Sequence, residues 1–322
     1  MTISTPTEYL SNQSFIGLAY ESGGFGSATS ASGYLPFTSE SLVGKNNIKN
    51  IPTIRQTRSE MTANYIGPYG VSGDIVYPFY PTSGCILLAA AMGHDTYSGG
   101  THNLTVSDGA LPSLTIEKYL AGVTDASVAG AASRQFAGMV VSKWALKLAI
   151  DSFAEATATM LGQLDNWIAP STPTFGTDVT PYSLLHISAT IGGSAAPYLT
   201  AIDLEIDNSA KALTTFQGTR YPALVYGGAR KVTGKFTTTM QTTALLKLAF
   251  AGTLQAVVIT LQQDVSHSAV FTLANVLLGD TVEQVKLGEV VMEEIPFEAY
   301  VVGSTADITV ALKNGAGAGY GF

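Results

Sequence analysis

The chain has 322 residues, enough for one large or two medium-sized domains with a substantial buried core. Hydrophobic residues make up 46% of it and charged residues only 12%, so we expect other copies of the chain to cover much of its surface. The net charge of −8 argues against binding the outside of a nucleic acid, and the longest apolar run, 84–93, is too short to span a membrane.

The two ends differ from the middle. Residues 1–33 are rich in Ser, Thr and Gly and predict a flexible N-terminal arm without the apolar segment of a secretion signal. Residues 314–322 predict a Gly-rich C-terminal tail. Cys85 is the only cysteine and can form no disulfide within the chain, which favours folding in a reducing cytoplasm.

Between the ends, hydrophobic residues recur mostly with a period of two. The segments 144–151, 201–208 and 307–313 each place aliphatic side chains on one face and polar ones on the other. In 201–208, Ile202, Leu204 and Ile206 alternate with Asp203, Glu205 and Asp207. Half-buried strands require this alternation, because successive side chains of a strand point to opposite faces of a sheet. The body is therefore predicted to be mainly β.

Two short helices are expected to interrupt the strands. Thr82–Gly93 and Thr242–Gly252 each begin with Thr or Ser capping candidates and end at a glycine suited to the left-handed position after a helix. A similar motif precedes each helix, Val71-Ser-Gly-Asp74 in one case and Val232-Thr-Gly-Lys235 in the other. The motifs lie 161 residues apart (232 − 71) and the final glycines 159 (252 − 93).

This repetition predicts an internal duplication. We expect a first domain over 34–164, a linker over 165–181 that is dense in Pro, Thr and Gly, and a second domain over 182–313. Chance similarity between two β-rich segments is the alternative explanation.

The segments 72–93 (SGDIVYPFYPTSGCILLAAAMG), 112–122 (PSLTIEKYLAG), 136–163, 198–236 and 293–301 (EEIPFEAYV) together resemble the tail tube (major tail) proteins of siphophages. The resemblance covers about residues 51–314 and depends on the order and spacing of patterns that are each weak alone. The segment 94–108, expected to be a loop insertion, and the C-terminal tail have no counterpart in it.

The resemblance implies a β-sandwich or open-barrel domain with one packed helix, present twice in this chain. It also implies a virion structural protein, made in the host cytoplasm, whose rings stack into a tube that conducts double-stranded DNA. A chain with two such domains would form a trimeric, pseudo-hexameric ring, with a hexamer as the alternative. The implied partners are sister chains and the tape measure, terminator and tail-tip proteins, with no membrane and no cofactor.

An acidic channel wall suits DNA transit, because like charge keeps phosphates from adhering. The first candidates for this wall are Asp203, Glu205 and Asp207, followed by Glu289 and Glu293. The three β-strand carboxylates could alternatively bind a hard cation, but no calcium-type loop encloses them.

No residues form a recognisable catalytic or metal-binding motif. The segment 227–235 resembles a phosphate-binding loop, but its spacing is one residue too long and Phe236 replaces the required Ser or Thr. The histidines His94, His102, His186 and His267 have no metal-type spacing, and Trp144 is expected in the core. The chain is therefore predicted not to be an enzyme. The competing functions are a carbohydrate-binding tail-tip adhesin and a baseplate or capsid decoration component.

Overall fold

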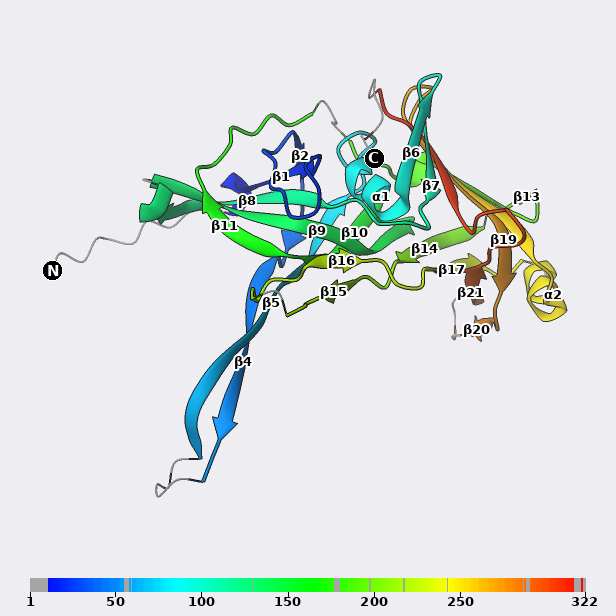
Figure 1. Cartoon of the computed structure of the whole chain (residues 1–322). Coiled ribbons are helices and arrows are strands. Elements are labelled where there is room, and N and C mark those ends of the chain that lie inside the picture. Colours follow the sequence, from blue (N-terminus) through cyan, green and yellow to red (C-terminus); the bar gives the residue numbers. More distant parts are fainter. Residues whose placement is uncertain are drawn as a thin grey trace.

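The structure is a computed structural model that describes residues 11–54, 58, 60–128, 130–176, 180–196, 198–216, 218–241, 243–285, 287, 290–315 and 320. Strands dominate both halves of the chain, which confirms the predicted mainly β class (Figure 1). The strands of the first half are β1 (Phe15–Tyr20), β2 (Gly33–Leu35), β3 (Ser39–Glu40), β4 (Val43–Pro52), β5 (Met61–Pro78), β6 (Gly93–Ser98), β7 (Thr101–Val106), β8 (Leu114–Asp125), β9 (Gly130–Ala149), β10 (Glu155–Gly162) and β11 (Leu164–Ile168).

The strands of the second half are β12 (Ile187–Ile191), β13 (Ser194–Ala195), β14 (Leu199–Asp207), β15 (Lys211–Leu213), β16 (Leu224–Tyr226), β17 (Lys231–Thr239), β18 (Gln255–Gln262), β19 (Ser268–Leu278), β20 (Val282–Gln284), β21 (Met292–Ala299) and β22 (Thr309–Lys313). The helices are α1 (Cys85–Met92) and α2 (Ala244–Ala251), with short 3-10 turns η1 (Ser11–Gln13), η2 (Ala126–Val128) and η3 (Leu184–His186).

One antiparallel sheet runs without a break from the first half into the second. Its strand order is β4–β5–β10–β9–β14–β17–β21–β20, and the two halves meet where β9 pairs with β14. At this junction Lys147 lies opposite Asp203, and Lys143 lies opposite Asp207. The odd-numbered residues of β14 therefore share a face with the lysines of β9, while Leu204 points into the core.

Further strands cover the inner face of this sheet. In the first half β8 pairs with β9 and β1, and β1 with β2. In the second half β12, β18, β19 and β22 form a layer that continues through β22 into β7 and β6. The hydrophobic core between the layers is shared by both halves. Trp144, predicted to be a core residue, is fully buried there against Phe79 and Phe271.

Both helices form where the sequence predicts them, and both end at a left-handed glycine: Gly93 has φ 86° and Gly252 φ 61°. Glycine is favoured here because it has no Cβ to clash in this conformation. The N-cap residue is Gly84 in α1, not the predicted Thr or Ser, and Thr243 in α2, and neither N-cap residue makes a side-chain capping hydrogen bond. The Thr82 hydroxyl instead donates to the carbonyl oxygen of Asn314, at 3.1 Å.

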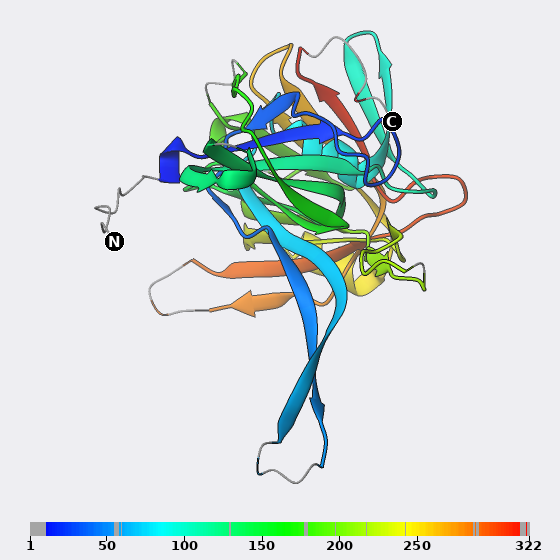
Figure 2. The ribbon, with the colours of Figure 1, turned by 60° about the vertical axis from the view of Figure 1, so that its left-hand side comes forward.

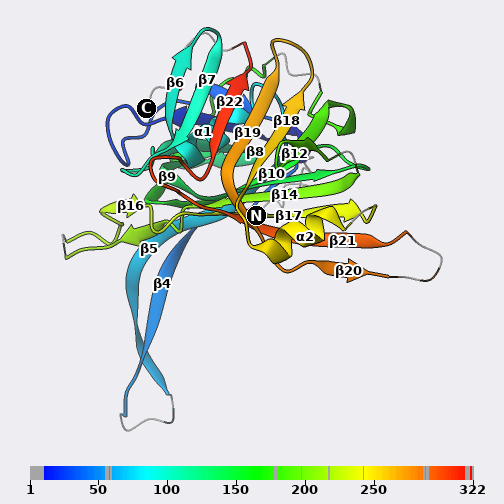
Figure 3. The ribbon, with the colours of Figure 1, turned by 90° about the vertical axis from the view of Figure 1, so that its right-hand side faces the viewer.

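Strands β4 and β5 form a twisted hairpin that projects far from the body in every view (Figures 1, 2 and 3). On the opposite side, β20 and the adjoining part of β21 form a shorter projection (Figure 3). The described part of the hairpin beyond residue 47 exposes Ile48, Ile51, Ile54, Met61, Tyr65 and Ile66. Exposed apolar side chains in this number indicate a contact surface.

Two expectations about irregular segments are wrong. The arm expected over 1–33 does not extend through that range, because β1 (Phe15–Tyr20) is buried between β2 and β8. The run FIGLAY is apolar on both faces, as a strand buried on both sides must be. Residues 94–108 are not a loop: β6 and β7 form a hairpin in which His102 is buried, with its Nδ1 2.8 Å from Asp95 Oδ2.

Candidate functional site

The predicted acidic residues of β14 lie on the outer face of the continuous sheet. Asp203, Glu205 and Asp207 alternate with the buried side chains of Leu204 and Ile206. The structure thus brings three of the five candidate carboxylates together on one surface, as the period of two requires.

Lysines from the neighbouring strands interleave with these acids. Lys143 on β9 lies 2.7 Å from Glu205, Lys235 on β17 lies 3.5 Å from Glu294, and Lys231 lies 3.3 Å from Glu298. These pairs are partly exposed, so each contributes at most about 1 kcal/mol to stability. These ion pairs were not predicted from the sequence. Lys143 and Lys147 do alternate with the apolar Trp144 and Leu146, and this pattern places both lysines on the polar face of their strand.

The whole face keeps an excess of carboxylates over ammonium groups. Its acids are Asp74, Glu155, Asp203, Glu205, Asp207, Glu294 and Glu298, and its bases are Lys45, Lys143, Lys147, Lys231 and Lys235. We call this surface the charged face. Opposite charges alternate along it, so it repels a polyanion weakly and offers few sites for one to adhere.

Glu293 does not belong to the charged face. It lies on the opposite side of β21, with Ile295 and Phe297, and is only 1% exposed. Its Oε1 has no hydrogen-bond partner among the described residues, and burial together with the nearby carboxylate of Glu283 raises the pKa of Glu293. Its selection as a wall residue is therefore wrong. Glu289 lies outside the described residues.

Strands β20 and β4 form the two edges of the continuous sheet. Among the described residues β20 pairs only with β21, and β3 and β4 pair only with β5. Unpaired edges present N–H and C=O groups that can pair with another chain. Both edges lie beside the charged face, so a partner strand at either edge would extend that face.

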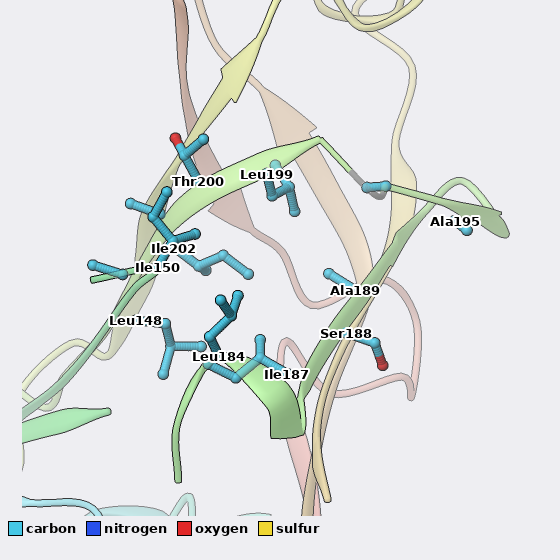
Figure 4. Close-up of a pocket in the computed structure, with 13 residues that line it drawn as sticks. Leu148, Ile150, Leu184, Ile187, Ser188, Ala189, Ala195, Leu199, Thr200 and Ile202 are labelled. Atoms are coloured by element: carbon cyan, nitrogen blue, oxygen red, sulfur yellow. The ribbon is translucent and has the colours of Figure 1, made fainter. Parts of the chain in front are cut away.

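An apolar pocket of about 340 Å³ marks the place where the two halves join. Leu148 comes from the end of β9 and Ile150 directly follows this strand, whereas Leu184 and Ile187 come from η3 and the start of β12. These side chains face a common space that Leu199 and Ile202 of β14 also border (Figure 4). The pocket is therefore a product of the β9–β14 junction.

Among the described residues, no group of three or more His, Cys, Asp or Glu side chains is placed to hold a metal ion. No helix in the described part of the chain is long and apolar enough to cross a membrane.

A family model described as "Phage tail tube protein" matches residues 11–299, which include both halves and the junction between them. No curated protein matches the chain.

Proposed function

The chain belongs to the phage tail tube protein family and is a structural subunit of the virion tail, and from this premise we propose that three copies close one layer of the tube around a DNA channel. Each chain contributes two tube repeats, so a layer of three chains has six. The proposal includes no catalytic step, and it places synthesis in the host cytoplasm.

The strand pairings support a repeat in each half. The order β4–β5–β10–β9–β8–β1 in the first half corresponds to β14–β17–β21–β19–β18–β12 in the second. The registers correspond as well. Val71 lies opposite Gly162, and Val232 lies opposite Ala299. Corresponding residues are thus 161 positions apart on β5 and β17 (232 − 71) and 137 positions apart on β10 and β21 (299 − 162).

An irregularity in the ladder recurs at the matching place. On β8 and β9, Leu114 lies opposite Met139 and Ile116 opposite Phe136. On β18 and β19, Gln255 lies opposite Val276 and Val257 opposite Leu273. Both pairs of strands therefore shift register at the same step. Corresponding residues are 141 positions apart on β8 and β18 (255 − 114) and 137 positions apart on β9 and β19 (276 − 139). β-Bulges are retained features of a fold, so a shared position favours duplication over chance.

The junction within the chain supplies the geometry of the junction between chains. Ala145 of β9 lies opposite Glu205 of β14. Its counterpart on β20 is Val282 (145 + 137). Glu205 lies opposite Thr233, whose counterpart is Ser72 (233 − 161), and Ser72 lies opposite Val43, so the spacing between β4 and β14 is 162 and the counterpart of Glu205 is Val43. Val282 and Val43 lie on the two free edges. Closing the ring therefore pairs β20 of one chain with β3–β4 of the next, with Val282 opposite Val43 and Asp280 opposite Lys45.

The charges at these edges suit the pairing. Within the chain Lys143 lies opposite Asp207. Between chains, the corresponding residues are Asp280 and Lys45, so an acid and a base again lie opposite each other, but the acid now replaces the lysine and the lysine replaces the acid. Opposite charges across strands stabilise a pair by about 0.2–1 kcal/mol. Closure also removes both free edges, and the charged face becomes the wall of the channel.

The β4–β5 hairpin provides the contact between layers in this proposal, because it projects beyond the body and its isoleucines and Tyr65 are exposed. Replacing residues 51–63 with Asn-Gly joins Asn50 to Asn64, which already lie opposite each other. The shortened protein should form single rings that do not stack. Tubes of normal length would exclude the hairpin as the stacking element.

Two measurements test the ring. Electron microscopy of assembled tubes should show three chains in each layer, and six would refute the trimer. The variant Val43→Cys/Val282→Cys should form disulfides between chains under mild oxidation, because the proposed pairing places these two residues opposite each other. The native Cys85 is buried and should not compete. Val43→Cys/Glu283→Cys is the matched control, because Glu283 points to the other face of the same strand.

A further inference from the structure

The segment that joins the two repeats is anchored at one buried tyrosine. Tyr182 is fully buried, and its ring lies 5.7 Å from that of Phe79. Its backbone N–H donates to Phe79 O at 3.1 Å, and its carbonyl oxygen accepts from Ala154 N at 2.8 Å. Phe79 and Ala154 are themselves joined, as Phe79 N donates to Ala154 O at 2.7 Å. Tyr182 therefore closes the end of the β5–β10 pair of the first repeat.

The second repeat has the same backbone bridge, and among its described residues none anchors it in this way. The counterparts of Phe79 and Ala154 are Met240 (79 + 161) and Val291 (154 + 137), and Met240 N donates to Val291 O at 3.0 Å. Among the described residues, Met240 O and Val291 N have no hydrogen-bond partner. These are the two groups that correspond to the ones Tyr182 satisfies in the first repeat.

The sequence before the first repeat contains a matching anchor. Leu18 lies opposite Ile116 and Ile191 opposite Val257, which sets the spacing between β1 and β12 at 173 (191 − 18). The turns η1 and η3 have the same spacing (184 − 11). The residue 173 positions before Tyr182 is Tyr9 (182 − 173). A threonine stands two positions before each tyrosine, Thr180 in one case and Thr7 in the other. Residues 1–10 lie outside the described part of the chain.

The described residues just before Val291 in the sequence include exposed apolar side chains, which we call the apolar patch. Val285 and Leu287 are both exposed, as is Val290. Val285 and Leu287 correspond to Leu148 and Ile150, which line the junction pocket together with Leu184 and Ile187 of the following repeat (Figure 4). A second chain placed by ring closure brings its residues 9–15 to this patch, because these residues correspond to 182–188.

We propose that Tyr9 of one chain docks on the Met240–Val291 bridge of the adjacent chain. Its N–H donates to Met240 O, its carbonyl oxygen accepts from Val291 N, and its ring covers the apolar patch. The N-terminal segment is then a strap within the ring and takes the place of the covalent segment between the repeats. This inference rests on the ring proposed above.

Crosslinking separates the two proposals. Tyr9→Cys/Met240→Cys should give disulfides between chains in assembled tubes, since the equivalent rings of Tyr182 and Phe79 lie 5.7 Å apart. Ser4→Cys/Met240→Cys, five residues away on the same segment, is the matched control. If Val43→Cys/Val282→Cys crosslinks while Tyr9→Cys/Met240→Cys behaves like its control, the strap is refuted and the ring stands. If neither pair crosslinks, the ring itself is refuted.

A single substitution gives a second readout. Tyr9→Ala should raise the critical concentration for assembly by about tenfold or more, as truncating a central interface tyrosine does. Tyr9→Phe should stay near the wild type, because the backbone bonds and the ring are kept. Thermal unfolding of the unassembled chain should be unchanged in both variants. A critical concentration for Tyr9→Ala equal to that of Tyr9→Phe would overturn the proposal.

Discussion

Replacing Trp144 tests the core that joins the two halves. Trp144 is fully buried, stacks on Phe271 of the second half with ring centroids 6.1 Å apart, and meets the edge of Phe79. Its Nε1 donates to the Tyr77 hydroxyl at 2.9 Å. Trp144→Ala leaves a large cavity, at about 3–5 kcal/mol, and removes one buried hydrogen bond, at about 1 kcal/mol. We expect the free energy of unfolding to fall by about 4–6 kcal/mol.

The matched control is Trp167→Ala on β11. Trp167 is 38% exposed and has the Arg134 guanidinium 6.0 Å from its ring centroid, a contact of about 0.5–1 kcal/mol. Urea unfolding, followed by circular dichroism and by the tryptophan that remains, should show a midpoint lower by about 1–2 M for Trp144→Ala only. Equal shifts for the two variants would refute the placement of Trp144 at the centre of a shared core.

Three further predictions concern charge. Lys45→Asp or Asp280→Lys alone should raise the critical concentration for assembly, and the double variant should restore it toward the wild type; a double variant worse than either single one would contradict the β20–β4 register. Glu293→Gln should stabilise the chain more at pH 7 than at pH 4. The raised pKa means that the folded state favours the protonated carboxyl, so the cost of ionising Glu293 is absent below the ordinary value of 4.5 and grows as the pH rises through the folded value. Urea midpoints at both pH values measure this, with Glu294→Gln on the opposite face as the control, and a gain independent of pH would contradict it. Asp203→Lys/Glu205→Lys should make assembled tubes retain DNA in a salt-sensitive manner; retention equal to that of the wild type would remove these residues from the channel wall.

The alternation of residue types was enough to predict most strands and their inner faces. The same alternation could have predicted that Glu293 is buried, because Ile295, Phe297 and Ala299 follow it at intervals of two and are buried on the same face. The ion pairs were harder to predict, because Lys143 meets Glu205 only through the pairing of β9 with β14, which joins segments about 60 residues apart.

Some features could not be predicted from local pattern at all. The projecting hairpin mixes isoleucines with asparagines and lysines, as a half-buried strand does, yet Ile48, Ile51 and Ile66 are all exposed. The burial of β1 depends on β8, about 100 residues away. In both cases tertiary pairing decides the environment of the segment, and local propensity does not.

The unequal burial of the two helices follows from the same pairing. All but one of the residues of α1 are buried, whereas α2 has no buried residue. Part of the difference comes from the second half of the chain, because Asn208 beyond β14 donates through Nδ2 to Ala91 O at 2.9 Å, near the end of α1.

The counterpart of Asn208 is Asn46 (208 − 162), which is exposed on β4, and the counterpart of Ala91 is Phe250 (91 + 159) on α2. In the proposed ring, closure would bring Asn46 of the next chain to the end of α2. The amides of α2 should therefore gain protection from hydrogen exchange on assembly, while those of α1, already covered within the chain, should change little. Equal changes in the two helices would mean that the in-chain junction does not describe the contact between chains.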